Sequence, residues 1–187
     1  IFKGNTSIIA FTELKYFTGL SEISEEAFAS CTGLWKISLP NSIGAICSRA
    51  FYKCSNLTNI SIDDKIATIG EYSFYGCARL KEIDIPNNLT AIESYAFENC
   101  SSITRVVIPE NVVSIGSAAF RGCSGLKFTS IPNNVKSIDY YAFEECTGEL
   151  YIDCDTPDGK VENDTYYYYR GCFTDSKFEK IVFGDNV

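Results

Sequence analysis

Residues 80–102 read LKEIDIPNNLTAIESYAFENCSS, and residues 103–125 read ITRVVIPENVVSIGSAAFRGCSG. Both stretches are 23 residues long, and apolar residues, a proline, an Ala-Phe pair and a cysteine stand at the same places in each. Six copies at one period indicate a repeat protein. The phenylalanines are Phe28, Phe51, Phe74, Phe97, Phe120 and Phe143, and the cysteines that follow them are Cys31, Cys54, Cys77, Cys100, Cys123 and Cys146.

Each unit carries a strand signal followed by a turn signal. Its pattern is L-x-x-I-x-I-P-x-x-V-x-x-I-x-x-x-A-F-x-x-C-x-x. The I-x-I part alternates with a period of two, which is typical of a short strand with one buried face. The proline ends that strand because it has no N–H for the ladder. Around A-F-x-x-C the spacing changes to three and four, and we expect one helical turn there.

A single unit of this size cannot bury its own apolar side, so the units are expected to stack. Each inward side chain then contributes roughly 1.5–3 kcal/mol when a neighbouring coil covers it. We predict a β-rich repeat solenoid with one long parallel sheet on one face, short helical turns elsewhere, and strands about 4.8 Å apart.

The repeat divides one solenoid domain, residues 1–187, into three stretches. Residues 1–28 are expected to form an N-terminal cap and a degraded first repeat, and residues 29–146 are the regular repeats. Residues 147–187 are interpreted as an irregular repeat with an insertion and a truncated last repeat. Because the pattern stops in mid-unit, we expect further coils or a cap beyond it. The apolar columns of the degraded repeat are expected at Phe11, Leu14, Tyr16, Leu20 and Ile23.

The composition excludes several classes of function. The chain has no histidine, which removes the commonest general base and most zinc and non-haem iron sites. Its 24 acidic residues outnumber 16 basic ones, which argues against nucleic-acid and anionic membrane partners. No apolar run is long enough to insert in a bilayer, and no export signal is visible. We therefore expect no enzyme, no metal and no cofactor.

The nine cysteines are expected to be small buried residues rather than ligands. No C-x-x-C pair occurs, although zinc and iron–sulfur sites usually need one. One thiol per coil, with every side chain pointing the same way, favours a reduced ladder over disulfides. Cys47 lies outside this column and is expected to be exposed, and a disulfide that involves Cys154 or Cys172 is left open.

On these residues the sequence resembles the BspA-like leucine-rich repeat family of bacterial cell-surface proteins. The resemblance runs from about residue 11 to 187 and rests on the two units quoted above, on ELKYFTGLSEI (13–23) and on TGELYIDC (147–154). The sequence departs from the general leucine-rich pattern at its asparagine position, and the cysteine column is expected to take that role. The resemblance implies a surface-displayed or secreted adhesion module that binds proteins and is not a catalyst.

The residues between the inward positions of each strand should line the outer surface of the sheet. This surface changes from coil to coil while the inward columns do not, so a ligand is expected there. Trp, Tyr and Arg commonly anchor interfaces, and we expect Arg105, Phe128 and Tyr151 to share its middle column. The alternative is that these are ordinary exposed strand residues, or that Trp35 packs under the first coil. The candidate partner-binding residues are Trp35, Lys36, Asn59, Glu82, Arg105, Phe128, Tyr151 and Asp153.

A second candidate is the tract Tyr166, Tyr167, Tyr168 and Tyr169. Four consecutive tyrosines cannot all point inward, so a partner surface is one interpretation and a loop covering the irregular coil is the other. Proline, glycine, aspartate and asparagine before the tract are typical of a loop. The acidic residues among them lack the spacing of a calcium loop.

These observations predict an adhesion or protein-binding module of the cell surface or extracellular space. Its expected partner is a host protein, an extracellular-matrix protein or another surface protein. Two alternatives stay open: a glycan-binding surface, in which aromatic side chains stack on sugar rings, and a structural stalk of a larger surface protein. Glycoside hydrolysis is disfavoured, because it needs two carboxylates that flank a cleft and a repeat sheet is open.

Overall fold

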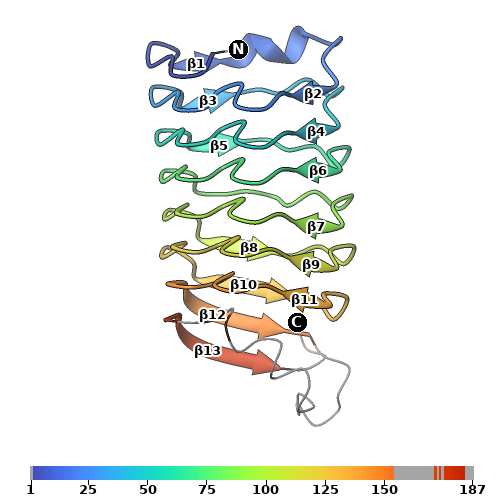
Figure 1. Cartoon of the computed structure of the whole chain (residues 1–187), viewed down its shortest axis with the longest axis vertical. Helices are drawn as coiled ribbons and strands as arrows, with labels where there is room; N and C mark the ends of the chain where they lie inside the picture. Colours follow the sequence, from blue (N-terminus) through green and yellow to red (C-terminus); the bar gives the residue numbers. More distant parts are fainter. Residues whose placement is uncertain (1, 154–170, 172, 174, 184–187) are drawn as a thin grey trace.

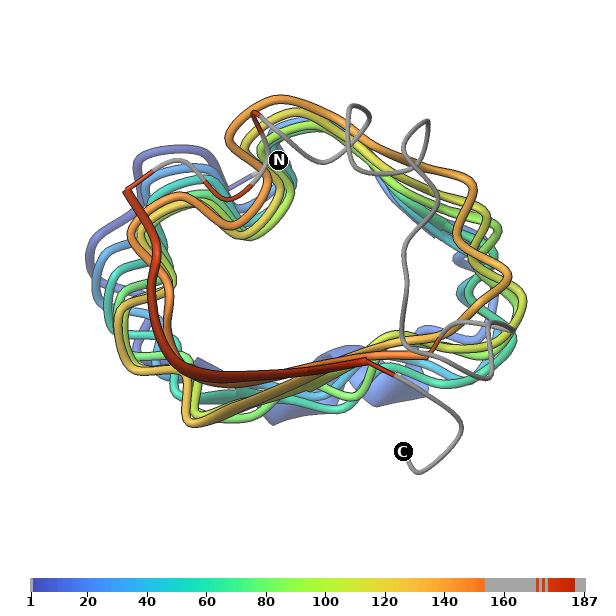
Figure 2. The same ribbon diagram turned by 90° about the horizontal axis from the view of Figure 1, so that it is seen from below.

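The computed structural model describes residues 2–153, 171, 173 and 175–183. Successive coils stack along one axis, with β1 at one end and β13 at the other (Figure 1). Viewed along that axis the coils superpose as a ring, so each coil passes once around a shared interior (Figure 2). The repeat solenoid predicted from the 23-residue period is confirmed.

One side of the solenoid carries parallel strands that we name the first strand column. They form two sheets, ordered β1-β3-β5 and β13-β12-β10-β8. The prediction of one continuous sheet is wrong, because residues 82–85 belong to no strand and separate the two sheets. The members of the column are β1 (Ala10–Phe11), β3 (Lys36–Ile37), β5 (Asn59–Ile60), β8 (Arg105–Val107), β10 (Phe128–Ile131), β12 (Thr147–Ile152) and β13 (Lys177–Phe183).

The interruption follows the regular unit that has an aspartate, Asp63, in place of the proline. The carboxylate of the next residue, Asp64, accepts hydrogen bonds from the backbone N–H of Asn87 at 2.9 Å and from its side-chain amide at 3.3 Å. A ladder bond that remains at this level, from the Lys81 N–H to the Thr58 carbonyl, is 3.3 Å long and exceeds the usual ~2.9–3.0 Å. The coils are therefore joined here by a side chain in the loop more than by a strand ladder.

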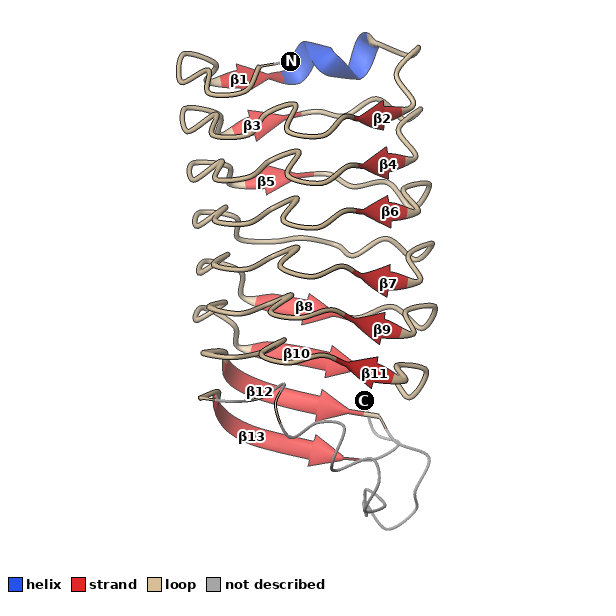
Figure 3. Ribbon diagram, in the orientation of Figure 1, coloured by secondary structure: helices blue, strands red, loops and turns tan. Residues whose placement is uncertain are grey.

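Each coil also contributes a second short strand, and these form a second strand column. The column is again parallel and is divided into the sheets β2-β4-β6 and β11-β9-β7 (Figure 3). A sheet on one face was expected from the sequence, and this second column was not anticipated. Each strand of this column has only two residues, of which one is a buried isoleucine, so the sequence contains no alternation that would reveal it. The strands are β2 (Glu22–Ile23), β4 (Ala45–Ile46), β6 (Thr68–Ile69), β7 (Ala91–Ile92), β9 (Ser114–Ile115) and β11 (Ser137–Ile138).

The segment around Ala-Phe-x-x-Cys is a run of turns, and the prediction of a helical turn there is wrong. Left-handed residues flank the phenylalanine on both sides: near Phe51, Arg49 has φ 57° and Lys53 has φ 55°. The Phe51 N–H donates to the Ser73 carbonyl of the next coil at 2.8 Å, whereas the Tyr52 N–H donates to Arg49 of its own coil at 3.0 Å. In a helix all these N–H groups would donate along the helix axis. Here they donate in turn to the next coil and to their own coil, and the bonds to the next coil join neighbouring coils.

The interior contains a column of phenylalanines beside a column of cysteines. From Phe28 to Phe143 the rings stack with centroids 5.3–5.5 Å apart. Each ladder cysteine is a free thiol that donates to a phenylalanine carbonyl one coil back, as Cys77 does to Phe51 at 3.2 Å. Burial raises the pKa of the Cys54 thiol to about 12, so it stays a protonated donor at neutral pH.

The first coil differs from the register expected for the degraded repeat. Phe11 pairs with Ile37, which is 26 residues later rather than 23. The 3-10 helix η1 (Thr12–Tyr16) lies in this coil and accommodates the extra three residues between its two strands. In the part of the chain that the structure describes, no helix is long and apolar enough to cross a membrane. Of the residues expected on apolar columns, Leu14 and Ile23 are buried, Phe11 is half-buried, and Tyr16 and Leu20 are exposed.

Candidate functional site

The predicted partner-binding residues lie on the outward side of the first strand column, which we name the outer face. Along β3 and β5 they alternate with buried residues, Lys36 beside Ile37 and Asn59 beside Ile60. The structure does not bring them into one cluster but distributes them along the solenoid axis. Trp35, Lys36, Asn59, Glu82 and Arg105 are exposed, and Phe128, Tyr151 and Asp153 are half-buried.

Trp35 lies at the N-terminal end of the outer face. The residue is 46% exposed, so it does not pack under the first coil. Its backbone N–H donates to the Ile9 carbonyl at 2.8 Å, and the Lys36 ammonium lies 5.9 Å from the centre of its ring. Three coils of about 4.8 Å separate Trp35 from Arg105, a distance that a small ligand does not bridge easily but a protein surface does.

The C-terminal part of the outer face carries two adjacent aromatic rings with a cation at each end. The Arg105 guanidinium lies over the Phe128 ring, with Cζ 5.4 Å from the ring centre. The Phe128 and Tyr151 rings are 5.1 Å apart and tilted by 32°. Lys180 Nζ lies 5.6 Å from the centre of the Tyr151 ring. We name these four side chains the cation–aromatic array; such contacts are worth about 0.5–1 kcal/mol each at exposed sites and hold the side chains in one arrangement.

Tyr151 enters the array from a different column than predicted. Glu149 pairs with Phe128, and Tyr151 pairs with Ser130. The reason is a shortened turn, because β12 starts directly after the cysteine and Gly148 adopts a left-handed φ of 84°. Tyr151 therefore reaches Phe128 diagonally, and its hydroxyl donates to the Glu149 carboxylate at 2.8 Å.

Lys180 belongs to the array although the sequence analysis did not select it. It pairs with Glu149 across β12 and β13, and the register shifts by one residue between Gly148 and Glu149. The available signal was the apolar pattern of this strand, since Phe178 and Ile181 match apolar columns of the repeat and Lys180 does not.

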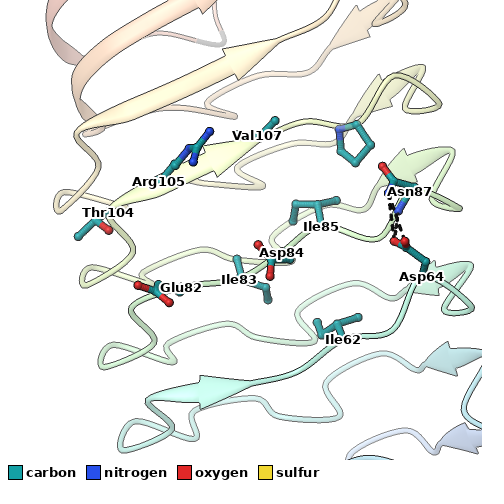
Figure 4. A pocket seen from close by; sticks show the side chains of 11 residues that line it. Ile62, Asp64, Glu82, Ile83, Asp84, Ile85, Asn87, Thr104, Arg105 and Val107 are labelled. Carbon is teal, nitrogen blue, oxygen red and sulfur yellow. Dashed lines mark hydrogen bonds between the residues drawn. The ribbon is translucent and has the colours of Figure 1, made fainter. Parts of the chain in front are cut away.

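Between Trp35 and the array, the outer face is hollowed where the sheet is interrupted. The hollow has a volume of about 750 Å³ and includes the predicted residues Glu82 and Arg105 (Figure 4). Its apolar lining comes from Ile62, Ile83, Ile85, Val107 and Pro109. Its polar lining comes from Asp64, Glu82, Asp84, Asn87, Thr104 and Arg105.

A second aromatic cluster lies in the turn segments, on a surface that the sequence analysis did not select. The Tyr52 and Tyr75 rings stack at 4.9 Å, and the Tyr72 and Tyr95 rings stack at 4.5 Å. The Arg49 guanidinium lies 5.2 Å from the centre of the Tyr72 ring, and burial raises the pKa of the Tyr72 hydroxyl. In the sequence, the recurrence of tyrosine at an interval of 23 residues could have revealed this cluster. Because the rings cover one another, the cluster offers mainly ring edges to a ligand.

Within the described stretches, no group of three or more histidine, cysteine or acidic side chains is placed to hold a metal ion. Cys47 was expected to be exposed but is half-buried, and burial followed by the charge of Glu22 raises the pKa of its thiol. The remaining candidates, Tyr166, Tyr167, Tyr168, Tyr169, Cys154 and Cys172, lie outside the described residues.

The parallel coils repeat the same interior residues in every copy, whereas the residues of the outer face vary from copy to copy. This arrangement defines a leucine-rich repeat solenoid. Six copies of the family described as "BspA type Leucine rich repeat region" match residues 21–150. The chain belongs to this family of BspA-type leucine-rich repeat proteins. No curated protein sequence matches the chain significantly.

Several solved structures share the fold. A leucine-rich repeat protein from Bacteroides ovatus is 20% identical over 90% of this chain and 67% of that one, with a TM-score of 0.56. The T. pallidum leucine-rich repeat protein is 27% identical over 79% of this chain and 72% of that one, with a TM-score of 0.58. The pneumococcal vaccine antigen PcpA is 20% identical over 95% of this chain, with a TM-score of 0.64, and the chain spans 46% of that protein's length.

Proposed function

We propose that the chain is the binding module of a cell-surface or secreted protein and holds a protein partner on its outer face. The proposal rests mainly on the cation–aromatic array. Arg and Tyr are among the residues that most often carry the binding energy of an interface. The array presents Arg105, Phe128, Tyr151 and Lys180 together, on strands that the stacked coils keep in place. Side chains that are already ordered lose less entropy on binding.

The extracellular location in this proposal draws on the family and on its structural neighbours. The neighbour PcpA is described as a vaccine antigen, which is a role for a protein that is accessible at the bacterial surface. A host protein, an extracellular-matrix protein or another surface protein is then the partner that such a module would meet.

The geometry of the array favours a protein over a glycan as the ligand. A sugar ring stacks on an open aromatic face, but in the array the Phe128 ring is covered by Arg105 and the Tyr151 ring lies beside Lys180. Both rings are also half-buried. A protein partner can instead use the charged groups and ring edges as they stand, with hydrogen bonds and ion pairs to the exposed cations.

The test compares binding by the chain and by a variant with Arg105→Ala, Phe128→Ala and Tyr151→Ala. Both are probed by surface plasmon resonance against extracellular-matrix proteins and by a glycan array. Loss of protein binding by about tenfold or more in the triple variant supports the proposal. Glycan binding in place of protein binding, or protein binding that is unchanged in the variant, would contradict it.

The matched control replaces a cation–aromatic contact of the same kind on the turn surface. Lys53 Nζ lies 5.1 Å from the centre of the Tyr52 ring, and the variant Tyr52→Ala with Lys53→Ala removes that contact. It should bind the partner as the unmodified chain does. A loss of equal size in this control would show that general surface change, and not the array, causes the effect.

A further inference from the structure

The hollow of the outer face is defined by the missing strand at residues 82–85. The strands on its two sides, β5 and β8, are each the last strand of their sheet. From Thr104 to Pro109 the lining runs along the strand direction for about 16 Å at ~3.3 Å per residue, which is the length of about five extended residues. Figure 4 shows Thr104 and Glu82 at one end of the hollow and Asn87 and Asp64 at the other.

The charges that line the hollow are unbalanced. Three carboxylates, those of Asp64, Glu82 and Asp84, face one cation, Arg105. The Asp64 carboxylate accepts its hydrogen bonds from Asn87, and the Arg105 guanidinium lies over the Phe128 ring. Among the described residues, none of the three ion pairs includes Glu82 or Asp84. Two exposed carboxylates therefore have no cationic side chain within ion-pair distance in the part of the chain that the structure describes.

The arrangement suits a cationic side chain better than a metal ion. The acidic groups do not come close enough together for three of them to share an ion, as judged over the described stretches. A lysine or arginine side chain needs only one or two carboxylates for its head group, and its aliphatic stem can lie on apolar surface. That surface is present, because Val107 is 43% exposed and Ile62 is half-buried in the same lining.

We propose that the hollow receives an extended segment of the protein partner, with a lysine or arginine side chain between Glu82 and Asp84 and an aliphatic neighbour against Ile62 and Val107. This proposal rests on the proposed function, because it places a second contact of the same partner directly beside the array. It assigns the partner a basic residue at the point where the outer face is acidic, while the array of Arg105 and Lys180 meets an acidic or polar part of that partner.

The experiment pans a library of displayed seven-residue linear peptides on the immobilised full chain. In parallel it pans the variant Glu82→Gln with Asp84→Asn, which keeps size and removes charge. Peptides enriched on the unmodified chain should contain Lys or Arg next to an aliphatic residue. A synthetic copy of the strongest peptide should bind the variant at least about tenfold more weakly by fluorescence polarisation, and its affinity should fall with added salt.

A matched control removes two exposed carboxylates elsewhere, by Glu71→Gln with Glu93→Gln, and should leave the peptide's affinity unchanged. Enrichment without a basic preference, equal binding to the acidic-hollow variant, or equal loss in the control each overturns the inference. Binding of a glycan that disappears in the same variant, without peptide enrichment, overturns it as well. Partner binding that needs Phe128 and Tyr151 but not Glu82 and Asp84 leaves the proposed function standing and sinks only this inference.

Discussion

The thiol of Cys100 donates a hydrogen bond to the backbone carbonyl of Phe74, 3.1 Å away in the preceding coil. The same relationship recurs along the solenoid, each time between residues 26 positions apart. The cysteine column thus gives one phenylalanine carbonyl per coil a second hydrogen bond and links neighbouring coils, which is the role expected of it in place of an asparagine ladder. The asparagines themselves lie at the surface, where Asn111 donates to the Asn87 carbonyl at 2.7 Å and Asn134 to Glu110 at 2.9 Å.

Replacing Cys100 by alanine should destabilise the chain by about 1–3 kcal/mol. The substitution removes a fully buried sulfur and one of the two hydrogen bonds that the Phe74 carbonyl accepts, leaving only the bond from the Cys77 N–H at 3.1 Å. Urea unfolding followed by circular dichroism measures the change. The control Cys47→Ala concerns a half-buried thiol outside the column and should cost less than about 0.5 kcal/mol. Equal costs at both positions would mean that the column has no special role.

The seven described cysteines should differ strongly in their reactivity. Burial raises the pKa of the Cys54 and Cys146 thiols to about 12 and raises those of Cys77, Cys100 and Cys123 well above their ordinary value. The thiolate is the reactive form, so iodoacetamide at pH 8 should leave these five unmodified in the folded chain. Cys47 should react first, more slowly than a free thiol and faster as the pH rises. Peptide mapping by mass spectrometry would refute this if Cys77 were labelled before Cys47.

The core was predictable from sequence because a solenoid repeats one set of contacts in every coil. Phe97 and Cys100 stand 23 residues from their counterparts on either side, and this period alone indicated that they stack. The strand alternation around Ile37 and Ile60 likewise indicated which residues face outward.

The features that escaped prediction depend on backbone bonds between coils. The left-handed turn residues include Arg49 and Tyr95, types that give no signal of a positive φ. Residues 82–85, where the sheet is interrupted, have their isoleucines in the same columns as the other repeats. They differ from those repeats only in the pairing of the backbone. The array depends on a turn shortened at Gly148, which shifts Tyr151 by two residues relative to the constant period.

Thr129 has a buried hydroxyl without a hydrogen-bond partner among the described residues. It pairs with Val106 on one side and Leu150 on the other, so its column is otherwise apolar. The substitution Thr129→Val keeps the branched shape and removes the unsatisfied hydroxyl, and should raise the free energy of unfolding by about 1 kcal/mol. Thr58→Val is the control, because the Thr58 hydroxyl donates to the Trp35 carbonyl at 3.1 Å. Urea unfolding should show the control unchanged or slightly destabilised, and a destabilised Thr129→Val variant would contradict the prediction.

Glu98 should make stability depend on pH. Its side chain is 9% exposed, and burial raises the pKa of its carboxyl although Arg121, 3.8 Å away, opposes the shift. The folded chain then holds this proton to a higher pH than the unfolded chain, so the contribution of Glu98 to stability is greatest below its ordinary pKa of 4.5 and falls as the pH rises through the folded value. Glu98→Gln should therefore gain in relative stability between about pH 4.5 and pH 7. Denaturant unfolding at several pH values checks this, and a relative stability that falls with pH would contradict it.

Gly148→Ala tests whether the shortened turn positions the array. Gly148 has a φ of 84°, and a Cβ atom there would lie 2.5 Å from Lys127 Cα and 2.6 Å from the Leu126 carbonyl oxygen, both of them backbone atoms that cannot move aside like a flexible side chain. The substitution should cost at least about 2 kcal/mol and displace β12 from β10, which would separate the Tyr151 and Phe128 rings. The control Gly19→Ala meets nothing within 4 Å and should be close to neutral. Urea unfolding measures the cost, and tyrosine fluorescence together with partner affinity measures the displacement. If Gly148→Ala lost stability but kept full affinity for the partner, partner binding would not depend on the present register of β12. Tyr151 would then not belong to the binding surface.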